Sequence, residues 1–142
     1  MRRTGTAAVA AALAIAIFAS SSQAKGDPDG HYRGTGDTTI YLNRDGRMIS
    51  YFVSDVHTSC LVGNMQPSTV IVQTTGKANI SVSRKGRFTA SVPFRDVQGF
   101  PNSGVASVSG RLKGTRISGH VQGSNTSCSF AQDYAVTLRH PF

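Results

Sequence analysis

Two stretches of this chain each have the pattern of a β-hairpin that leads into a cysteine, one at residues 39–60 and one at residues 107–128. Shifted by 68 positions without a gap, residues 46–60 match residues 114–128 at seven of fifteen positions, including Gly, Ile, Val and the final Thr-Ser-Cys. In both stretches a strand with alternating apolar residues ends at a glycine turn and a second strand follows. This repeated unit favours an antiparallel sheet held by long-range contacts.

The first 24 residues have the pattern of an export signal and are not expected to join the fold. Met1, Arg2 and Arg3 make a basic start, 7–19 is an apolar run, and 22–24 is a small-x-small cleavage site. The apolar run is too short to span a bilayer, which needs about 20 residues. We therefore predict a signal peptide at 1–24 and a secreted or envelope-associated protein.

The rest of the chain has the composition of one all-β domain. Without the two arginines of the signal, 13 Lys and Arg residues stand against 7 acids, every acid is Asp, and the net charge is +6. Val, Ile, Thr and Ser dominate over strong helix formers, which favours strands. We expect a flexible lead-in at 25–30 and a single domain at 31–142.

Two cysteines in an exported chain predict one disulfide, between Cys60 and Cys128. This bridge closes a loop of roughly 70 residues, and the chain-entropy model assigns such a loop on the order of 4 kcal/mol of stability.

Turn residues and alternation place the strands. Asp45 and Gly46 predict a type I′ turn with Leu42 opposite Ile49 and Ile40 opposite Tyr51. A three-residue loop is expected at 84–86, and a loop carrying Cys60 at 57–68. The expected strands are 31–35, 39–43, 48–56, 69–83, 87–94, 107–112, 117–122 and 130–139.

The disulfide decides whether 69–83 is one strand or two. In an up-and-down meander, loops that follow strands of equal parity lie at the same end. One strand there leaves four between the cysteines and lets them meet within the 4 to 7 Å Cα spacing of a disulfide. We therefore predict about eight antiparallel strands closed into a small barrel filled by side chains, with a two-layer β-sandwich as the alternative.

The same count gathers the tips of three hairpins at the end away from the cysteines. These tips carry seven basic residues and one acid, Asp45. Such a cluster attracts an anionic partner such as a wall polymer or lipid headgroups, although basic tips also serve solubility and block edge pairing. No aromatic residues interleave the tips, which disfavours specific nucleic-acid binding. The candidate anion-binding residues are Arg44, Arg47, Arg84, Lys85, Arg87, Lys113 and Arg116.

Other chemistry has weaker signals. A metal held by Asp55, His57 and His31 has no recognised ligand spacing, so neither a metal nor a cofactor is predicted. No catalytic motif occurs and Glu is absent, which disfavours an enzyme.

The alternative functions are a carrier of a small apolar ligand in the barrel mouth and an enzyme inhibitor acting through the loop at 100–103. The carrier's pocket would be lined by Tyr32, Tyr51, Phe88, Phe94, Phe130 and Tyr134.

A set of turn and strand spacings runs through the chain: Tyr32-x-Gly34, Asp45-Gly46, Cys60, Gly86-x-Phe88, Gly110-x-Leu112, Ile117-x-Gly119 and Cys128. In these spacings the chain resembles a loose group of small exported domains that are common among high-GC Gram-positive bacteria. The resemblance implies a single bridged β-domain outside the cytoplasm and implies no activity or site residue.

Overall fold

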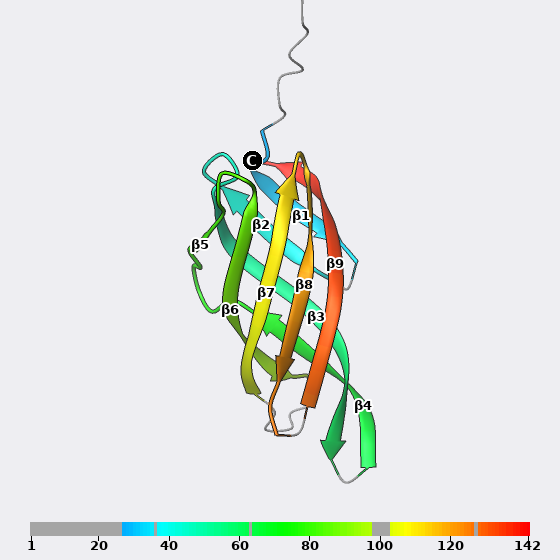
Figure 1. Ribbon diagram of the computed structural model, residues 1–142. Coiled ribbons are helices and arrows are strands. Elements are labelled where there is room, and N and C mark those ends of the chain that lie inside the picture. The colour runs from blue at the N-terminus through cyan, green and yellow to red at the C-terminus, as the bar shows by residue number, and fades with distance from the viewer. Residues whose placement is uncertain (1–26, 36, 63, 98–102, 127) are drawn as a thin grey trace, which may run out of the picture.

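A computed structural model shows an all-β chain (Figure 1). It describes residues 27–35, 37–62, 64–97, 103–126 and 128–142, but not the side chains of 59–62, 64–68 and 128. The predicted signal peptide lies outside these residues. The strands are β1 (Gly30–Gly34), β2 (Thr39–Asn43), β3 (Met48–Val62), β4 (Asn64–Gln73), β5 (Ile80–Ser81), β6 (Arg87–Asp96), β7 (Ser103–Lys113), β8 (Arg116–Ser124) and β9 (Cys128–Pro141).

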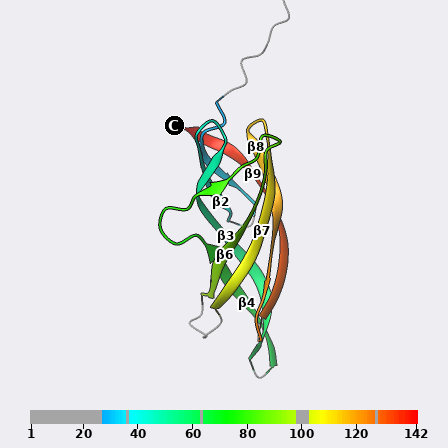
Figure 2. The ribbon, with the colours of Figure 1, turned by 60° about the vertical axis from the view of Figure 1, so that its left-hand side comes forward.

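The nine strands form one antiparallel, ring-like sheet. The order is β2-β1-β9-β8-β7-β6-β4-β3-β5, and the additional pairings of β3 with β2 and with β9 bring the ends together. The antiparallel all-β fold expected from the sequence is thereby confirmed. Figures 1 and 2 show the β2–β3, β5–β6 and β7–β8 tips at one end of the sheet and the β3–β4 hairpin projecting at the other.

The segment expected as one strand at 69–83 crosses the sheet once, with an interruption. β4 pairs with β3 up to Val53 opposite Gln73, and β5 pairs with the start of the same strand, Ile49 opposite Ile80. Between them the Thr74 hydroxyl accepts a hydrogen bond from the Phe52 N–H at 3.1 Å, and the Ala78 N–H donates to the Ser50 carbonyl oxygen at 3.0 Å before β5 begins at Ile80. Because β4 and β5 follow one another along β3, the number of crossings matches the predicted meander.

The prediction of a loop at 57–68 is wrong. β3 continues to Val62 and β4 begins at Asn64, so these residues form a long two-stranded ribbon. Pro67, a residue type that cannot donate to a strand ladder, lies opposite Ser59. The pairing of β4 with β6 covers only 70–72, so Pro67 lies on an edge of β4 that needs no N–H donor.

The turn of the first hairpin is confirmed, but its register shifts one residue beyond it. Leu42 pairs with Ile49 as predicted, whereas Ile40 pairs with Phe52 instead of Tyr51. A β-bulge at Ser50 causes the shift, because an extra residue in one strand turns every later side chain to the other face. The predicted inward position of Tyr51 is therefore wrong.

Phe52 takes that inward position and is fully buried. Its ring meets the ring of Tyr134 edge to face, with centroids 5.6 Å apart. Tyr51 instead joins a row of rings on the outer face, 4.9 Å from Tyr41, which stacks on His31 at 4.1 Å.

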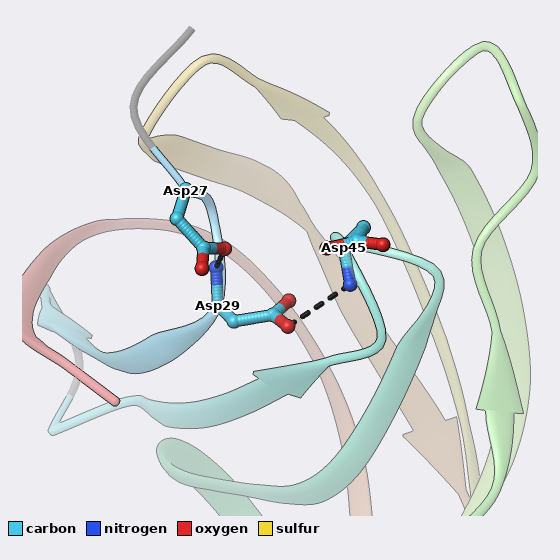
Figure 3. A group of neighbouring side chains, drawn as sticks. All are labelled: Asp27, Asp29 and Asp45. Carbon is cyan, nitrogen blue, oxygen red and sulfur yellow. Dashed lines mark hydrogen bonds between the residues drawn. The ribbon is translucent and has the colours of Figure 1, made fainter.

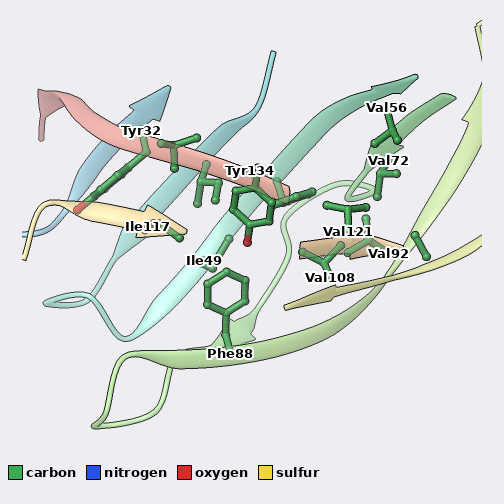
Figure 4. Close-up of a cluster of buried hydrophobic side chains, with 14 of the residues drawn as sticks. Tyr32, Ile49, Val56, Val72, Phe88, Val92, Val108, Ile117, Val121 and Tyr134 are labelled. Carbon is green, nitrogen blue, oxygen red and sulfur yellow. The ribbon is translucent and has the colours of Figure 1, made fainter. Parts of the chain in front are cut away.

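Apolar side chains fill the interior of the sheet (Figure 4). Glycines make room for the largest of them: the hydroxyl of Tyr134 lies over Gly110 and Gly119 and donates to the Ser109 carbonyl oxygen at 3.0 Å. The buried apolar residues are Tyr32, Ile40, Leu42, Ile49, Phe52, Val56, Val70, Val72, Val82, Phe88, Val92, Phe94, Ala106, Val108, Ile117, Val121, Phe130, Tyr134 and Val136.

The backbones of the two cysteines lie directly opposite one another. β3 pairs with β9 at Ser59 with Ser129 and at Cys60 with Cys128. Directly opposed residues of an antiparallel pair have Cα atoms about 4.5 to 5.5 Å apart, inside the range of a disulfide. The sulfur atoms lie outside the described residues, so the bond itself stays a prediction.

Replacing both cysteines tests that bond. We expect the oxidised mature protein to weigh two hydrogens less than its reduced form by intact mass. Cys60→Ser combined with Cys128→Ser should lower the free energy of unfolding in urea by up to about 4 kcal/mol, because the unfolded chain gains the freedom of a long loop. An unreduced protein with two titratable thiols would contradict the prediction.

A methyl group at Gly119 should destabilise the fold. A Cβ there would meet the Ser109 carbonyl oxygen and come 2.5 Å from the Tyr134 hydroxyl, so we expect Gly119→Ala to cost about 1 to 3 kcal/mol through overpacking. Ser118→Ala, on the exposed neighbour in β8, is the matched control and should change stability by less than about 0.5 kcal/mol. Equal urea midpoints for the two variants would contradict this packing.

Candidate functional site

The three basic tips come together at one end of the sheet, and we call their seven Lys and Arg residues the basic end. The Val82 N–H donates to the Arg47 carbonyl oxygen at 2.8 Å, which ties the β2–β3 turn to the start of the β5–β6 turn. The Leu112 N–H donates to the Gly86 carbonyl oxygen at 2.7 Å, which ties the β5–β6 turn to the β7–β8 hairpin. The gathering expected from the strand count is present, and all seven basic residues are exposed.

The backbone of these tips explains why the cations point outward. Asp45 and Gly46 have positive φ, 55° and 74°, as a type I′ turn requires, and Arg44 before them also has a positive φ of 56°, which a two-residue turn alone does not require. Ser83 and Arg87 close the predicted three-residue loop, since the Ser83 N–H donates to the Arg87 carbonyl oxygen at 2.8 Å. Because each tip is a tight turn at the end of the sheet, all seven of its Lys and Arg residues are exposed.

Two acids, Asp27 and Asp29, also lie at the basic end, next to Asp45 (Figure 3). No sequence pattern predicted their position there. Ligand oxygens of Asp27 and Asp29 lie within 4.8 Å of those of Asp45. Counted with these two, seven basic residues stand against three acids, and the excess falls from the six charges expected from the tips alone to four. The end of the sheet remains strongly positive.

Asp29 binds backbone rather than the arginines. Its carboxylate accepts hydrogen bonds from the Asp45 N–H at 2.9 Å and the Gly46 N–H at 2.8 Å, and Asp27 accepts from the Asp29 N–H at 2.9 Å (Figure 3). The segment just before β1 therefore packs on the β2–β3 turn and stabilises it. Three carboxylates this close also have the spacing of metal ligands, but satisfying turn N–H groups accounts for the position of Asp29.

The cations of the basic end form no ion pair with any carboxylate among the described residues. Within the described part of the chain, the one ion pair joins His120 Nδ1 to Asp133 Oδ1 at 2.7 Å, on neighbouring strands β8 and β9. The guanidinium and ammonium groups of the basic end are thus available to an external anion.

A hollow of about 260 Å³ opens at the foot of the β2–β3 turn. Arg44, Arg47 and Met48 line it from the turn, and Asn79 and Ser81 line it from the segment around β5. The pairing of Met48 with Ser81 brings the two segments together. Sequence reasoning missed Asn79 and Ser81, because no local pattern shows that β5 pairs with the start of β3.

A second hollow, of about 340 Å³, lies on the flank of the sheet where β4 and β6 diverge. Ile71, Phe94 and Pro93 give it an apolar part, and Gln73 and Arg95 lie at its polar part. It is open to the surface and separate from the filled interior, so it differs from the barrel-mouth pocket expected of a carrier.

Two other candidate sites were a metal site at Asp55, His57 and His31 and an inhibitor loop at 100–103. Asp55 and His57 lie two residues apart on β3, whereas His31 stacks on Tyr41 in the outer row of rings. No cluster of three possible ligands in the described residues contains these three side chains. The loop proposed for an inhibitor lies outside the described residues except for Ser103, where β7 begins.

No protein-family model, curated protein or solved structure matches this chain. The comparisons thus place it in no enzyme family, and the resemblance to small exported domains stays a prediction. The described residues include no helix that has the length and apolar character of a membrane span.

The buried hydroxyl of Tyr32 makes the stability of the fold depend on pH in the alkaline range. Its hydroxyl donates to the Pro28 carbonyl oxygen at 2.6 Å, and burial, followed by the charges of Asp29 and Asp27, raises its pKa to about 12. A raised pKa means that the folded state holds the proton more tightly than the unfolded state. The contribution of Tyr32 is therefore complete below pH 10 and is lost as the pH rises toward 12.

We expect Tyr32→Phe to lose less stability than the wild-type protein between pH 10 and pH 12, because phenylalanine cannot ionise. Urea unfolding at steps across this window measures the difference. Parallel declines in the two proteins would show that Tyr32 ionises as easily in the folded state as in the unfolded chain.

Proposed function

We propose that this protein is a small, secreted, non-catalytic binding module whose basic end holds an anionic polymer of the cell surface or the surrounding medium. The observation that carries the proposal is the convergence of seven exposed cations without carboxylate partners at one end of the sheet. The export signal expected at residues 1–24 supports the proposed location.

Electrostatics favours a polymer over a single small anion. Like charges on neighbouring tips repel one another, and an anion that neutralises several of them removes that repulsion. The Debye length is about 8 Å at physiological ionic strength, so a single charge outside a close contact is largely screened. A chain with repeated anionic groups contacts several tips at once and gains from each.

The sheet supports such contacts without rearrangement. The tips are joined by backbone hydrogen bonds, and Asp29 fixes the β2–β3 turn. Little conformational freedom of the backbone is lost on binding, and this preorganisation favours affinity. The long basic side chains retain the freedom to follow a repeating, irregular polymer.

The test uses charge reversal at matched positions. Arg116→Glu changes a cation of the basic end, and Arg95→Glu makes the same change at the far end of β6, where Arg95 is also exposed. We expect Arg116→Glu to weaken binding to polyphosphate by at least about tenfold and Arg95→Glu to leave it nearly unchanged, measured by titration calorimetry at low salt.

Salt and full neutralisation complete the test. Binding should weaken steeply as salt rises, because each neutralised phosphate releases a counterion. Replacing all seven cations of the basic end by Gln should abolish binding and leave the circular dichroism spectrum unchanged. Tight binding that ignores both salt and these substitutions would refute the proposed function.

A further inference from the structure

We propose that the hollow at the foot of the β2–β3 turn is a subsite for a phosphate group of the bound polymer. We call it the Arg44–Arg47 hollow, and it is lined by Arg44, Arg47, Met48, Asn79 and Ser81. This inference rests on the proposed function and adds the class of anion that the basic end selects.

The hollow presents hydrogen-bond donors and no acid. Each arginine offers a planar fork of N–H donors, Asn79 offers an amide NH₂, and Ser81 offers a hydroxyl. No carboxylate lines the hollow itself, since Asp45, the acid between Arg44 and Arg47 in the turn, is not among its lining residues. Its volume of about 260 Å³ is several times the roughly 30 Å³ share of a liquid water, so it admits a phosphate with the first atoms of the units it joins.

Secondary structure fixes the backbone on both sides of the hollow. The Arg47 N–H donates to the Asn43 carbonyl oxygen at 3.1 Å and to the Arg44 carbonyl oxygen at 3.2 Å. Ser81 is fixed opposite Met48 by the pairing of β5 with β3. The backbone around the hollow is therefore part of the hydrogen-bonded sheet, and the exposed side chains of Arg44, Arg47 and Asn79 extend from it.

The donor set fits a phosphate better than a carboxylate. A carboxylate has two oxygens in a plane and is satisfied by one arginine fork, whereas a tetrahedral phosphate directs its oxygens to several sides. Two arginines, an asparagine and a serine line the hollow, and their side chains together offer donors for that wider set of acceptors. The other five cations of the basic end attract any polyanion and do not discriminate.

The experiment keeps charge constant and changes only the donor fork. Arg44→Lys with Arg47→Lys retains both positive charges and removes both forks. We expect binding of inorganic polyphosphate to weaken about tenfold, while binding of poly-L-glutamate, a carboxylate polymer, weakens by a smaller factor at the same salt concentration, because each carboxylate uses at most one of the two forks.

Arg84→Lys with Arg87→Lys is the matched control, because it makes the same change at the basic end outside the hollow. It should not alter the ratio of the two affinities. Asn79→Ala, which removes a neutral donor from the hollow, should weaken polyphosphate binding selectively. Circular dichroism and melting temperature check that each variant remains folded, and all the substituted residues are exposed.

The outcomes separate this inference from the proposed function. If the wild-type protein binds neither polymer, the proposed function fails. If it binds both and the hollow variant weakens both equally, the basic end binds polyanions but the phosphate subsite is refuted. If vesicles of phosphatidylglycerol bind more tightly than polyphosphate with the same sensitivity to the hollow variant, a lipid headgroup replaces the polymer as the source of the phosphate.

Discussion

Strand β3 pairs with β2, β4, β5 and β9, and the closed arrangement of the sheet depends on these four pairings. Its first residues hold β2 and β5, which carry the turns of the basic end, and its last residues reach β9 at the cysteines. One long strand therefore sets both ends of the molecule. The separation between the basic end and the cysteine end follows from its length.

The bulge at Ser50 shows how one residue in that strand assigns side chains to two different surfaces. Before it, Ile49 faces the interior, and after it Phe52 does, three positions later instead of two. Phe52 thus reaches Tyr134 in the core, and Tyr51 stands beside Tyr41 outside. Since the rings of the outer row pack against one another, we assign the row to stabilising the sheet rather than to binding.

The charges at the basic end divide into two roles. The carboxylate of Asp29 is engaged with the N–H groups of Asp45 and Gly46, and it fixes the turn that presents Arg44 and Arg47. The cations have no such partner within the described residues. The acids therefore shape this end of the sheet, and the cations remain for a ligand, which is the physical basis of both proposals.

The sequence by itself determined the features that depend on neighbours along the chain. Alternation and turn glycines predicted the strand class, the pairing of Leu42 with Ile49 and the loop closed by Ser83 and Arg87, because a tight turn fixes the register of the strands it joins. The gathering of the basic tips followed from the strand count, which used the expected contact between Cys60 and Cys128. Only the tertiary structure decided the extra residue at Ser50, the docking of Asp29, the ribbon that replaced the loop at 57–68, and the approach of Asn79 and Ser81 to Arg47. Each of these depends on pairing or contacts between segments that no turn joins directly, and such contacts are set by how the whole sheet closes.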